Sequence, residues 1–189
     1  MRKGIKSVSM DDIATQLAMS KKTLYKWFEN KDQIVQATME QHLSSNACDF
    51  QQLLGRATNA IDEIFLMLDW IRGQFADMMP GVFYDLQKYH PGTWKLWLEH
   101  KNTFMLAQIK SNLERGIAEG LYRPELDVEV IARMRLALIE LLLDAEVYPA
   151  REFEPRRVQL AILEHFMLGI ASLKGYKLIN QYRQVTEEE

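Results

Sequence analysis

Two short amphipathic segments joined by a tight polar turn lie near the start of this chain, and they constrain its fold more than any other feature. Each segment begins with a serine, a residue that caps helix N-termini well, and then places two apolar residues at the i, i+4 spacing of one helix face. The residues are Ser9, Ile13 and Leu17 in the first segment and Ser20, Leu24 and Phe28 in the second. The pattern predicts a helix-turn-helix, whose second helix would present its N-terminal residues to base edges in the major groove of DNA.

Positive charge is concentrated in the same part of the chain. The net charge is −3 overall, but residues 1–35 carry a net charge of +3 and the rest of the chain carries −6. A small basic module on an acidic body is the electrostatic footprint of a protein that binds phosphates, because the acidic body discourages general binding to polyanions. The alternative is that these lysines only solvate a helix face.

The side chains of the second helix suggest which residues meet DNA. Lys21 and Lys22 could donate to guanine O6 and N7, and Thr23 could contact bases or a thymine methyl group. Phosphates would be held by Ser9, Tyr25 and Lys31. The predicted DNA-binding residues are Ser9, Ser20, Lys21, Lys22, Thr23, Tyr25, Lys26 and Lys31.

Residues 20–31 read Ser-x-x-Thr-Leu-Tyr-x-x-Phe-x-x-Lys, and this segment closely resembles the DNA-binding region of the tetracycline-repressor (TetR) family of bacterial transcription regulators. The matching residues are Gly4, Val8, Ile13, Ala14, Ser20, Leu24, Tyr25, Phe28 and Lys31. The resemblance implies a helix-turn-helix domain over residues 1–45, followed by a helical ligand-binding and dimerisation domain over residues 46–189. It also implies a helix before Gly4. Either the given sequence starts after that helix or the protein lacks it, and a true absence would leave the apolar faces of the two short helices without a packing partner.

Composition favours an all-α fold. The chain has 189 residues, of which 48% are hydrophobic, with only 9 glycines and 5 prolines, and β-branched runs are rare. Beyond the motif, helical patterns cover residues 31–54, 59–79, a shorter segment ending at 89, 93–119, 127–146 and 154–175.

The last two predicted helices are apolar over more than one face, so they must be covered on more than one side. In the resembled family the last two helices pair across a two-fold axis, and a homodimer also suits a palindromic operator. The alternative is that a single subunit buries both faces. The residues predicted at the dimer interface are Leu138, Leu142, Ile162, Phe166 and Ile170.

Aromatic and methionine side chains are concentrated in the middle of the chain. Their simplest interpretation is core packing, but the family resemblance implies a small-molecule pocket here, and such walls suit an apolar ligand. Trp94 and Trp97 are three residues apart on one helix face, and they could equally be a structural pair. The predicted pocket residues are Phe65, Trp70, Met78, Phe83, Trp94, Trp97 and Phe104.

The leading hypothesis is a ligand-responsive homodimeric repressor in the cytoplasm, whose partners are double-stranded operator DNA and an apolar or aromatic effector. The alternative is a dimeric small-molecule-binding or interaction protein without a DNA function. The sequence has no glycine-rich phosphate loop, no paired histidine spacing for zinc and no nucleophile elbow, so neither an enzyme nor a metal or cofactor is expected. The single cysteine, Cys48, fits a reducing compartment, and no apolar run approaches the ~18 residues that span a membrane.

Overall fold

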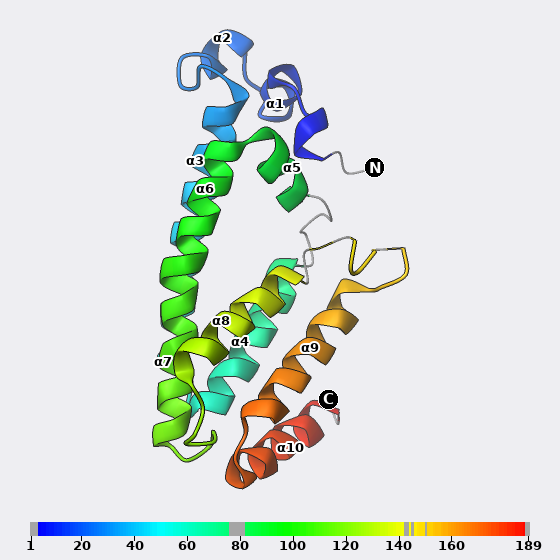
Figure 1. The fold of residues 1–189 in the computed structure, drawn as a ribbon. Helices are drawn as coiled ribbons and strands as arrows, with labels where there is room; N and C mark the ends of the chain where they lie inside the picture. Colours follow the sequence, from blue (N-terminus) through cyan, green and yellow to red (C-terminus); the bar gives the residue numbers. More distant parts are fainter. Residues whose placement is uncertain (1–3, 76–81, 142–143, 145, 150, 188–189) are drawn as a thin grey trace. The chain divides into compact units, whose positions relative to one another are not determined.

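The computed structural model describes residues 4–75, 82–141, 144, 146–149 and 151–187, with the side chains of 71–75, 155 and 184–187 left out. The chain divides into two compact units. The first unit comprises Met1–Asp49 and Met78–His100, and the second comprises Phe50–Asp77 and Lys101–Glu189. Both are built from helices, which Figure 1 labels along the chain.

The first unit begins with short helical elements and continues into longer ones. They are the 3₁₀ turn η1 (Ile5–Ser7), α1 (Met10–Gln16), α2 (Lys21–Leu24), the start of α3 (Lys31–Leu54), α5 (Val82–Tyr89) and α6 (Pro91–His100). The turn between α1 and α2 reverses the chain at Ala18, whose φ of 51° lies in the left-handed region. Helices α1 and α2 pack together, and Ala14 of α1 and Leu24 of α2 are buried. Of the residues in the predicted i, i+4 pairs, Leu24 is buried and Leu17 is exposed.

Helix α5 packs against η1 within the first unit. The Asp85 carboxylate accepts a hydrogen bond of 3.1 Å from the backbone N–H of Lys6. Gly4 approaches the same carboxylate so closely that a Cβ atom would lie 2.9 Å from Asp85 Oδ2. The ammonium group of Lys6 lies 4.6 Å from the centre of the Tyr89 ring. These contacts join residues 4–6 to α5, although they are far apart in the sequence.

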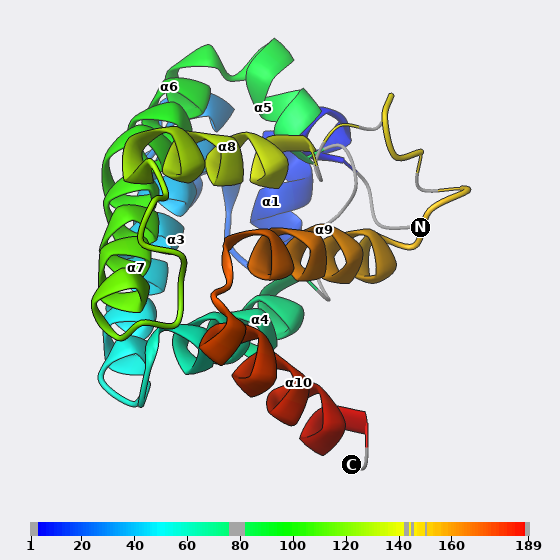
Figure 2. The ribbon, with the colours of Figure 1, turned by 60° about the horizontal axis from the view of Figure 1, so that its bottom comes forward.

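The second unit holds the larger apolar core. Its further elements are α4 (Ala60–Phe75), one π-helical turn η2 (Lys101–Met105), α7 (Leu106–Ala118), α8 (Val128–Leu141), α9 (Pro155–Ile170) and α10 (Leu173–Glu187). Helix α7 packs against both α4 and α8, and α10 packs beside α4, as Figure 2 shows. Phe65 of α4 stacks on Tyr182 of α10 with ring centres 5.0 Å apart.

A buried polar network joins α4, α7 and the segment that follows α7. The Tyr122 hydroxyl lies 3.1 Å from the Ala60 carbonyl oxygen and 3.0 Å from Asn112 Oδ1. Asn112 Nδ2 donates to the same carbonyl at 2.9 Å. The Tyr122 ring packs on Gly116, where a Cβ atom would lie 2.0 Å from Tyr122 Cδ2. Each of these buried polar groups has a partner, so the network costs little to bury and fixes one arrangement of the helices.

Most predicted helices are confirmed, and α3 has the predicted bounds. One prediction was wrong: the helix expected over residues 154–175 ends at Ile170, and a separate helix begins at Leu173. The break is held by contacts distant in sequence. The N–H of Ser172 donates to the Leu121 carbonyl at 2.9 Å, and the Ser172 hydroxyl accepts from the N–H of Gly175. Ser172 therefore caps the extra helix.

The compact units also refine the predicted domain limits. The predicted boundary between residues 45 and 46 lies in α3, and the units divide the same helix between Asp49 and Phe50. Contacts place α5 and α6 with the helix-turn-helix rather than with the larger bundle. Among the residues described, no helix combines the length and the apolar character needed to cross a bilayer.

Candidate nucleic-acid interface

Helix α1 is fixed by a capping box at its N-terminus. The Ser9 side chain accepts from the backbone N–H of Asp12 at 3.1 Å, and the Asp12 carboxylate accepts from the N–H of Ser9 at 2.9 Å. The Ser9 hydroxyl also donates to that carboxylate at 2.7 Å. The cap was predicted, but the hydroxyl proton expected to meet a phosphate is already engaged within the protein.

Helix α2 is a single turn, shorter than the predicted helix to Phe28. The Ser20 side chain caps it by accepting from the N–H of Thr23 at 3.1 Å. The two hydroxyl groups, Ser20 Oγ and Thr23 Oγ1, lie 2.8 Å apart. Ser20 therefore orients the first turn of α2, and the Thr23 side chain stands beside it at the helix N-terminus. The residues after Leu24 form hydrogen-bonded turns.

The predicted DNA-binding lysines fall into two groups. Lys21 forms an ion pair with Asp11 of α1. The ammonium group of Lys31 donates to the carbonyl oxygens of Ile5 at 2.5 Å and Lys6 at 3.2 Å, at the end of η1. Lys31 therefore holds η1 against the start of α3, which gives it a structural role that sequence reasoning missed.

Lys22 and Lys26 form the second group. Both are exposed, and no ion pair holds either ammonium group within the described part of the chain. They are therefore free to meet an anion without breaking an internal contact. Lys21 would therefore have to break its ion pair with Asp11 to bind DNA, whereas Lys22 and Lys26 would not.

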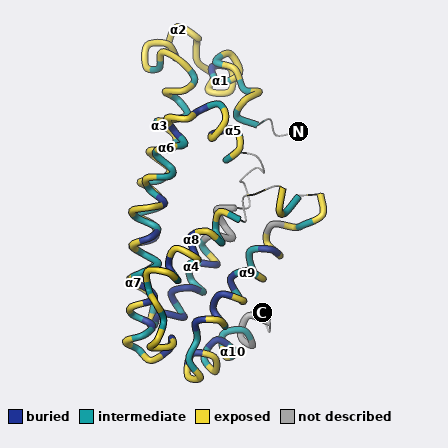
Figure 3. Tube along the Cα trace, viewed as in Figure 1, coloured by how far each residue is buried: buried dark blue, intermediate teal, exposed yellow. Residues whose placement is uncertain are grey.

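Two aromatic side chains that follow α2 are exposed. Tyr25 is half-exposed, and Trp27 keeps 77% of its surface accessible. Figure 3 shows that α1, α2 and the turns around them are mostly exposed. Sequence reasoning missed Trp27, because it lies off the apolar stripe formed by Leu24 and Phe28. Its position between Lys26 and Phe28 could have predicted its exposure, because a tryptophan outside the apolar stripe does not face the core.

The apolar faces of the two short helices are only partly covered. Leu24 is buried and Ile13 and Phe28 are half-buried, whereas Leu17 is exposed.

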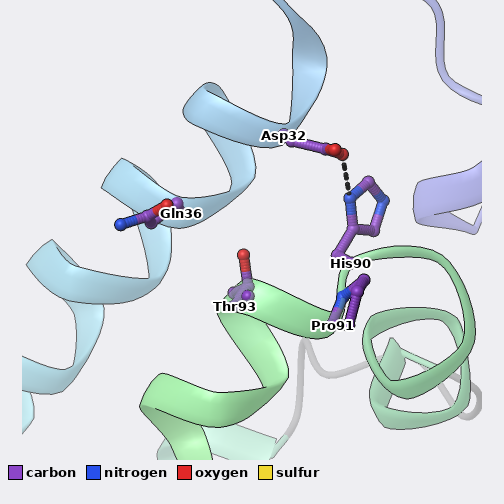
Figure 4. Close-up of a pocket in the computed structure, with 6 residues that line it drawn as sticks. Asp32, Gln36, His90, Pro91 and Thr93 are labelled. Atoms are coloured by element: carbon purple, nitrogen blue, oxygen red, sulfur yellow. Dashed lines mark hydrogen bonds and ion pairs between the residues drawn. The ribbon is translucent and has the colours of Figure 1, made fainter.

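A small polar pocket lies at the start of α3. It is lined by Asp32, Gln36, His90, Pro91, Gly92 and Thr93. His90 is 5% exposed, and its Nδ1 lies 2.6 Å from Asp32 Oδ1. Figure 4 shows that the other ring nitrogen, Nε2, points away from Gln36 and Thr93. The pair ties the first turn of α3 to the junction of α5 and α6, so it positions the helix-turn-helix within its own unit.

The predicted pocket residues form separate aromatic contacts. In the first unit, the ring of Phe83 lies 6.5 Å from that of Trp94 and 5.1 Å from that of Trp97. In the second unit, Phe65 stacks on Tyr182, Phe104 packs on Phe50, and Trp70 is half-buried. Met78 lies outside the described residues. Trp94 and Trp97 of α6 therefore share one neighbour, Phe83 of α5.

The residues predicted for the dimer interface are placed differently from one another. Phe166 and Ile170 are buried in the core of their own chain, so the prediction that they face a second subunit is corrected. Both belong to an apolar core that also includes residues of α4, α7 and α8, and the Arg135 guanidinium of α8 lies 5.3 Å from the Phe166 ring. Leu138 and Ile162 are half-buried. Leu142 lies outside the described residues.

Comparisons with known proteins agree with this geometry. The sequence profile of the family described as "Bacterial regulatory proteins, tetR family" matches residues 1–38. The uncharacterized HTH-type transcriptional regulator YvaF of Bacillus subtilis is 29% identical over 89 residues, which are 47% of this chain and 47% of YvaF. The HTH-type transcriptional repressor KstR2 of Mycolicibacterium smegmatis is 24% identical over 134 residues, which are 69% of this chain and 65% of KstR2.

The chain thus spans about half the length of YvaF and less than two thirds of KstR2. Among solved structures, a transcriptional regulator from Saccharomonospora viridis in complex with choline matches with a TM-score of 0.74 and 16% identity. The match covers 90% of this chain and 91% of that one, which establishes that the two share a fold.

Proposed function

We propose that this chain is a DNA-binding transcriptional regulator of the TetR type, which works as a homodimer and responds to a small molecule; the profile match over residues 1–38 supports the family assignment. The observation that carries the proposal is the surface of the helix-turn-helix. Two capped helices and the turn after them present the exposed side chains of Lys22 and Lys26, which pair with no acid among the described residues, in the region that the family profile matches.

In the proposed complex, the N-terminus of α2 enters the major groove. Lys22 donates to guanine O6 and N7, and the Thr23 methyl group contacts a thymine methyl. Lys26 and Tyr25 bind phosphates, which position the module without reading sequence. Ser9 and Ser20 act through the helix caps, and Lys31 acts by holding η1 in place.

The second unit supports a homodimer through α8 and α9. Val130 and Met134 lie one turn apart on α8 and are both exposed, which leaves an apolar stripe for a second copy to cover. A two-fold dimer places two copies of α2 on the half-sites of a palindromic operator. This stripe replaces Phe166 and Ile170 as the proposed contact.

The effector proposal rests on the fold and on the aromatic side chains of both units. A protein with this fold was solved with choline bound, so the fold can hold a small molecule. A ligand that binds the DNA-releasing arrangement more tightly than the DNA-bound one would lower the affinity for the operator.

The test begins with selection of genomic DNA fragments by the purified chain, followed by titration of the selected duplex at several salt concentrations. A change of Lys22 and Lys26 to alanine together should abolish the preference for the selected duplex. Lys177→Ala is the matched control, because it removes an exposed lysine of α10 in the second unit. It should leave binding unchanged.

If no duplex is enriched over bulk DNA, the proposed function fails. The alternative function, a dimeric small-molecule-binding protein without a DNA role, is then the better description. A sedimentation measurement completes the test, since a monomer at micromolar concentration contradicts the homodimer.

A further inference from the structure

One buried cation of the second unit has no counter-ion among the described residues. Arg135 of α8 is 6% exposed, and its Nη1 has no hydrogen-bond partner in the described structure. Its guanidinium lies 5.3 Å from the centre of the Phe166 ring on α9. The ring covers one face of the guanidinium, but an aromatic face accepts none of the N–H groups that project from the guanidinium edge.

The carboxylates on the two helices that flank Arg135 are engaged elsewhere. On α8, Glu129 pairs with Lys110 and Arg133, and Glu140 pairs with Lys101. On α9, Glu164 pairs with Arg183, and Glu154 caps the helix. No described acid on α8 or α9 is therefore left to neutralise Arg135.

Burial without a counter-ion destabilises the charged form of Arg135. It lowers the pKa of the guanidinium to about 10, and desolvation is the cause. The side chain is still charged at neutral pH, so the protein carries a desolvated positive charge in its helical bundle. Such a charge is costly unless a partner arrives.

Lys101 is a second buried cation of the same unit, and its charge is neutralised. It is 8% exposed, close to the value for Arg135, and its ammonium group forms an ion pair with Glu140. Lys101 lies in the π-helical turn η2, which places it against α8. Two buried cations of similar exposure thus differ in one respect: Lys101 pairs with an acid, and Arg135 pairs with none that the structure describes.

We propose that Arg135 binds the anionic group of the effector, so that the effector is an organic anion with an apolar body. This inference rests on the proposed function, because it names the chemical class of the ligand that regulates DNA binding. The planar guanidinium edge matches a carboxylate or a phosphate, each of which accepts two parallel N–H bonds. The Phe166 ring lies against the guanidinium, and Leu136 and Leu163 belong to the same apolar core, which suits a ligand with an apolar body.

The test measures thermal stability in the absence of DNA, with straight-chain carboxylates from hexanoate to palmitate and the corresponding alkyl phosphates below their micelle concentrations. Alcohols and trimethylammonium compounds of equal chain length, together with choline, are the neutral and cationic probes. The wild-type unfolding midpoint should rise with at least one anion and not with its neutral or cationic counterpart. Absence of a shift with every anion, or an equal shift with the alcohols, contradicts the proposal.

Arg135→Met separates ligand binding from a structural role. It removes the buried charge and keeps an apolar side chain, so the midpoint without ligand should rise by a few degrees and the anion response should disappear. A guanidinium needed only for packing on Phe166 would instead lower the midpoint, which would overturn the proposal. Arg133→Met is the matched control: this exposed arginine on the same helix pairs with Glu129, and its loss should preserve the anion response.

Two further outcomes distinguish the alternatives. If Arg135→Met dissociates the dimer and no anion responds, the counter-ion comes from a second subunit and the proposal is wrong. If anions stabilise the wild type while no operator is found, the anion site stands and the proposed DNA function fails. If the anion site and the operator binding are both observed, the stabilising anion should also release operator DNA from the wild type and not from Arg135→Met.

Discussion

The two compact units are stabilised in different ways. In the first unit, short helices are held by side-chain caps and by single polar ties such as Lys31 to the carbonyls of η1. In the second, an apolar core and a satisfied polar network join helices that are distant in sequence. The first unit keeps Lys22 and Lys26 exposed for a partner outside the protein, whereas the second also buries two cations, Lys101 and Arg135.

The contrast follows from the length of the helices. An isolated helix shorter than ~12 residues is marginal in water, so α1 and α2 depend on their caps and on contacts with their neighbours. The longer helices of the second unit bury enough apolar surface to be stable through packing. Surface residues of the first unit can therefore be substituted one at a time without loss of the fold. A substitution in the close-packed core of the second unit disturbs its neighbours.

The largest expected effect is at the closest approach in the second unit. Gly116→Ala would place a Cβ atom 2.0 Å from Tyr122 Cδ2, on a ring held by hydrogen bonds to Ala60 and Asn112. We expect the free energy of unfolding to fall by about 3 kcal/mol, as in overpacked cores. Urea denaturation measures this loss.

Gly169→Ala is the control for that change. A Cβ atom there meets nothing within 4 Å, so alanine should be neutral or stabilise α9 by up to about 1 kcal/mol. If both variants unfold at the wild-type urea concentration, the second unit is not close-packed around Tyr122, and the contrast between the units fails.

The next effect belongs to the surface of the first unit. Lys22→Ala should weaken binding to the selected operator by about 1–3 kcal/mol and relax specificity at one position in each half-site. Its unfolding midpoint should stay at the wild-type value, because Lys22 makes no ion pair with the described residues. Fluorescence anisotropy on operator variants measures the change. Equal weakening on every duplex would make Lys22 a phosphate contact instead.

Lys26 and Lys31 sharpen the comparison within the first unit. Lys26→Met should reduce the dependence of log affinity on log salt by about one unit, because one phosphate contact is lost. Lys31→Met should leave that slope intact and lower the free energy of unfolding by about 1–2 kcal/mol, since the carbonyls of Ile5 and Lys6 lose a charged donor. A lower slope for Lys31→Met would restore its predicted phosphate role.

Local features of the fold could be predicted from sequence, because they depend on residues close together in the chain. The caps at Ser9 and Ser20 and the bounds of α3 follow from spacing and composition. The break at Ser172 could not be predicted, because Leu121 supplies its partner. The four-residue row that contains Phe166 indicates a buried face, but periodicity does not say whether the same chain or a second subunit covers it.

The candidate site was predicted less completely than the fold. Spacing identified the lysines of α2, but not which were already engaged: the partners of Lys21 and Lys31 come from other elements. Arg135 gave no signal in the sequence, because an arginine within an amphipathic helix is normally exposed. Its burial depends on how α9 packs on α8, which only the structure provides.

The smallest expected effect is a pH dependence in the second unit. Glu63 of α4 is buried, and burial raises its pKa, although hydrogen bonds from Asn112 and the charge of Arg115 oppose the rise. A carboxyl group whose folded pKa is raised stabilises the protein below its unfolded pKa, about 4.5, and loses that contribution as pH rises through the folded pKa. Glu63→Gln cannot ionise, so its stability relative to the wild type should increase from pH 4.5 upward and then level off.

The variant also loses the ion pair with Arg115, whose N–O distance is 3.2 Å in the wild type. This loss shifts the free energy of unfolding of the variant without producing the expected rise with pH. Chemical denaturation of both proteins across the acid range measures the difference. If the relative stability of the variant instead decreases with pH, Arg115 and Asn112 outweigh desolvation, and the polar network of the second unit prefers a charged Glu63.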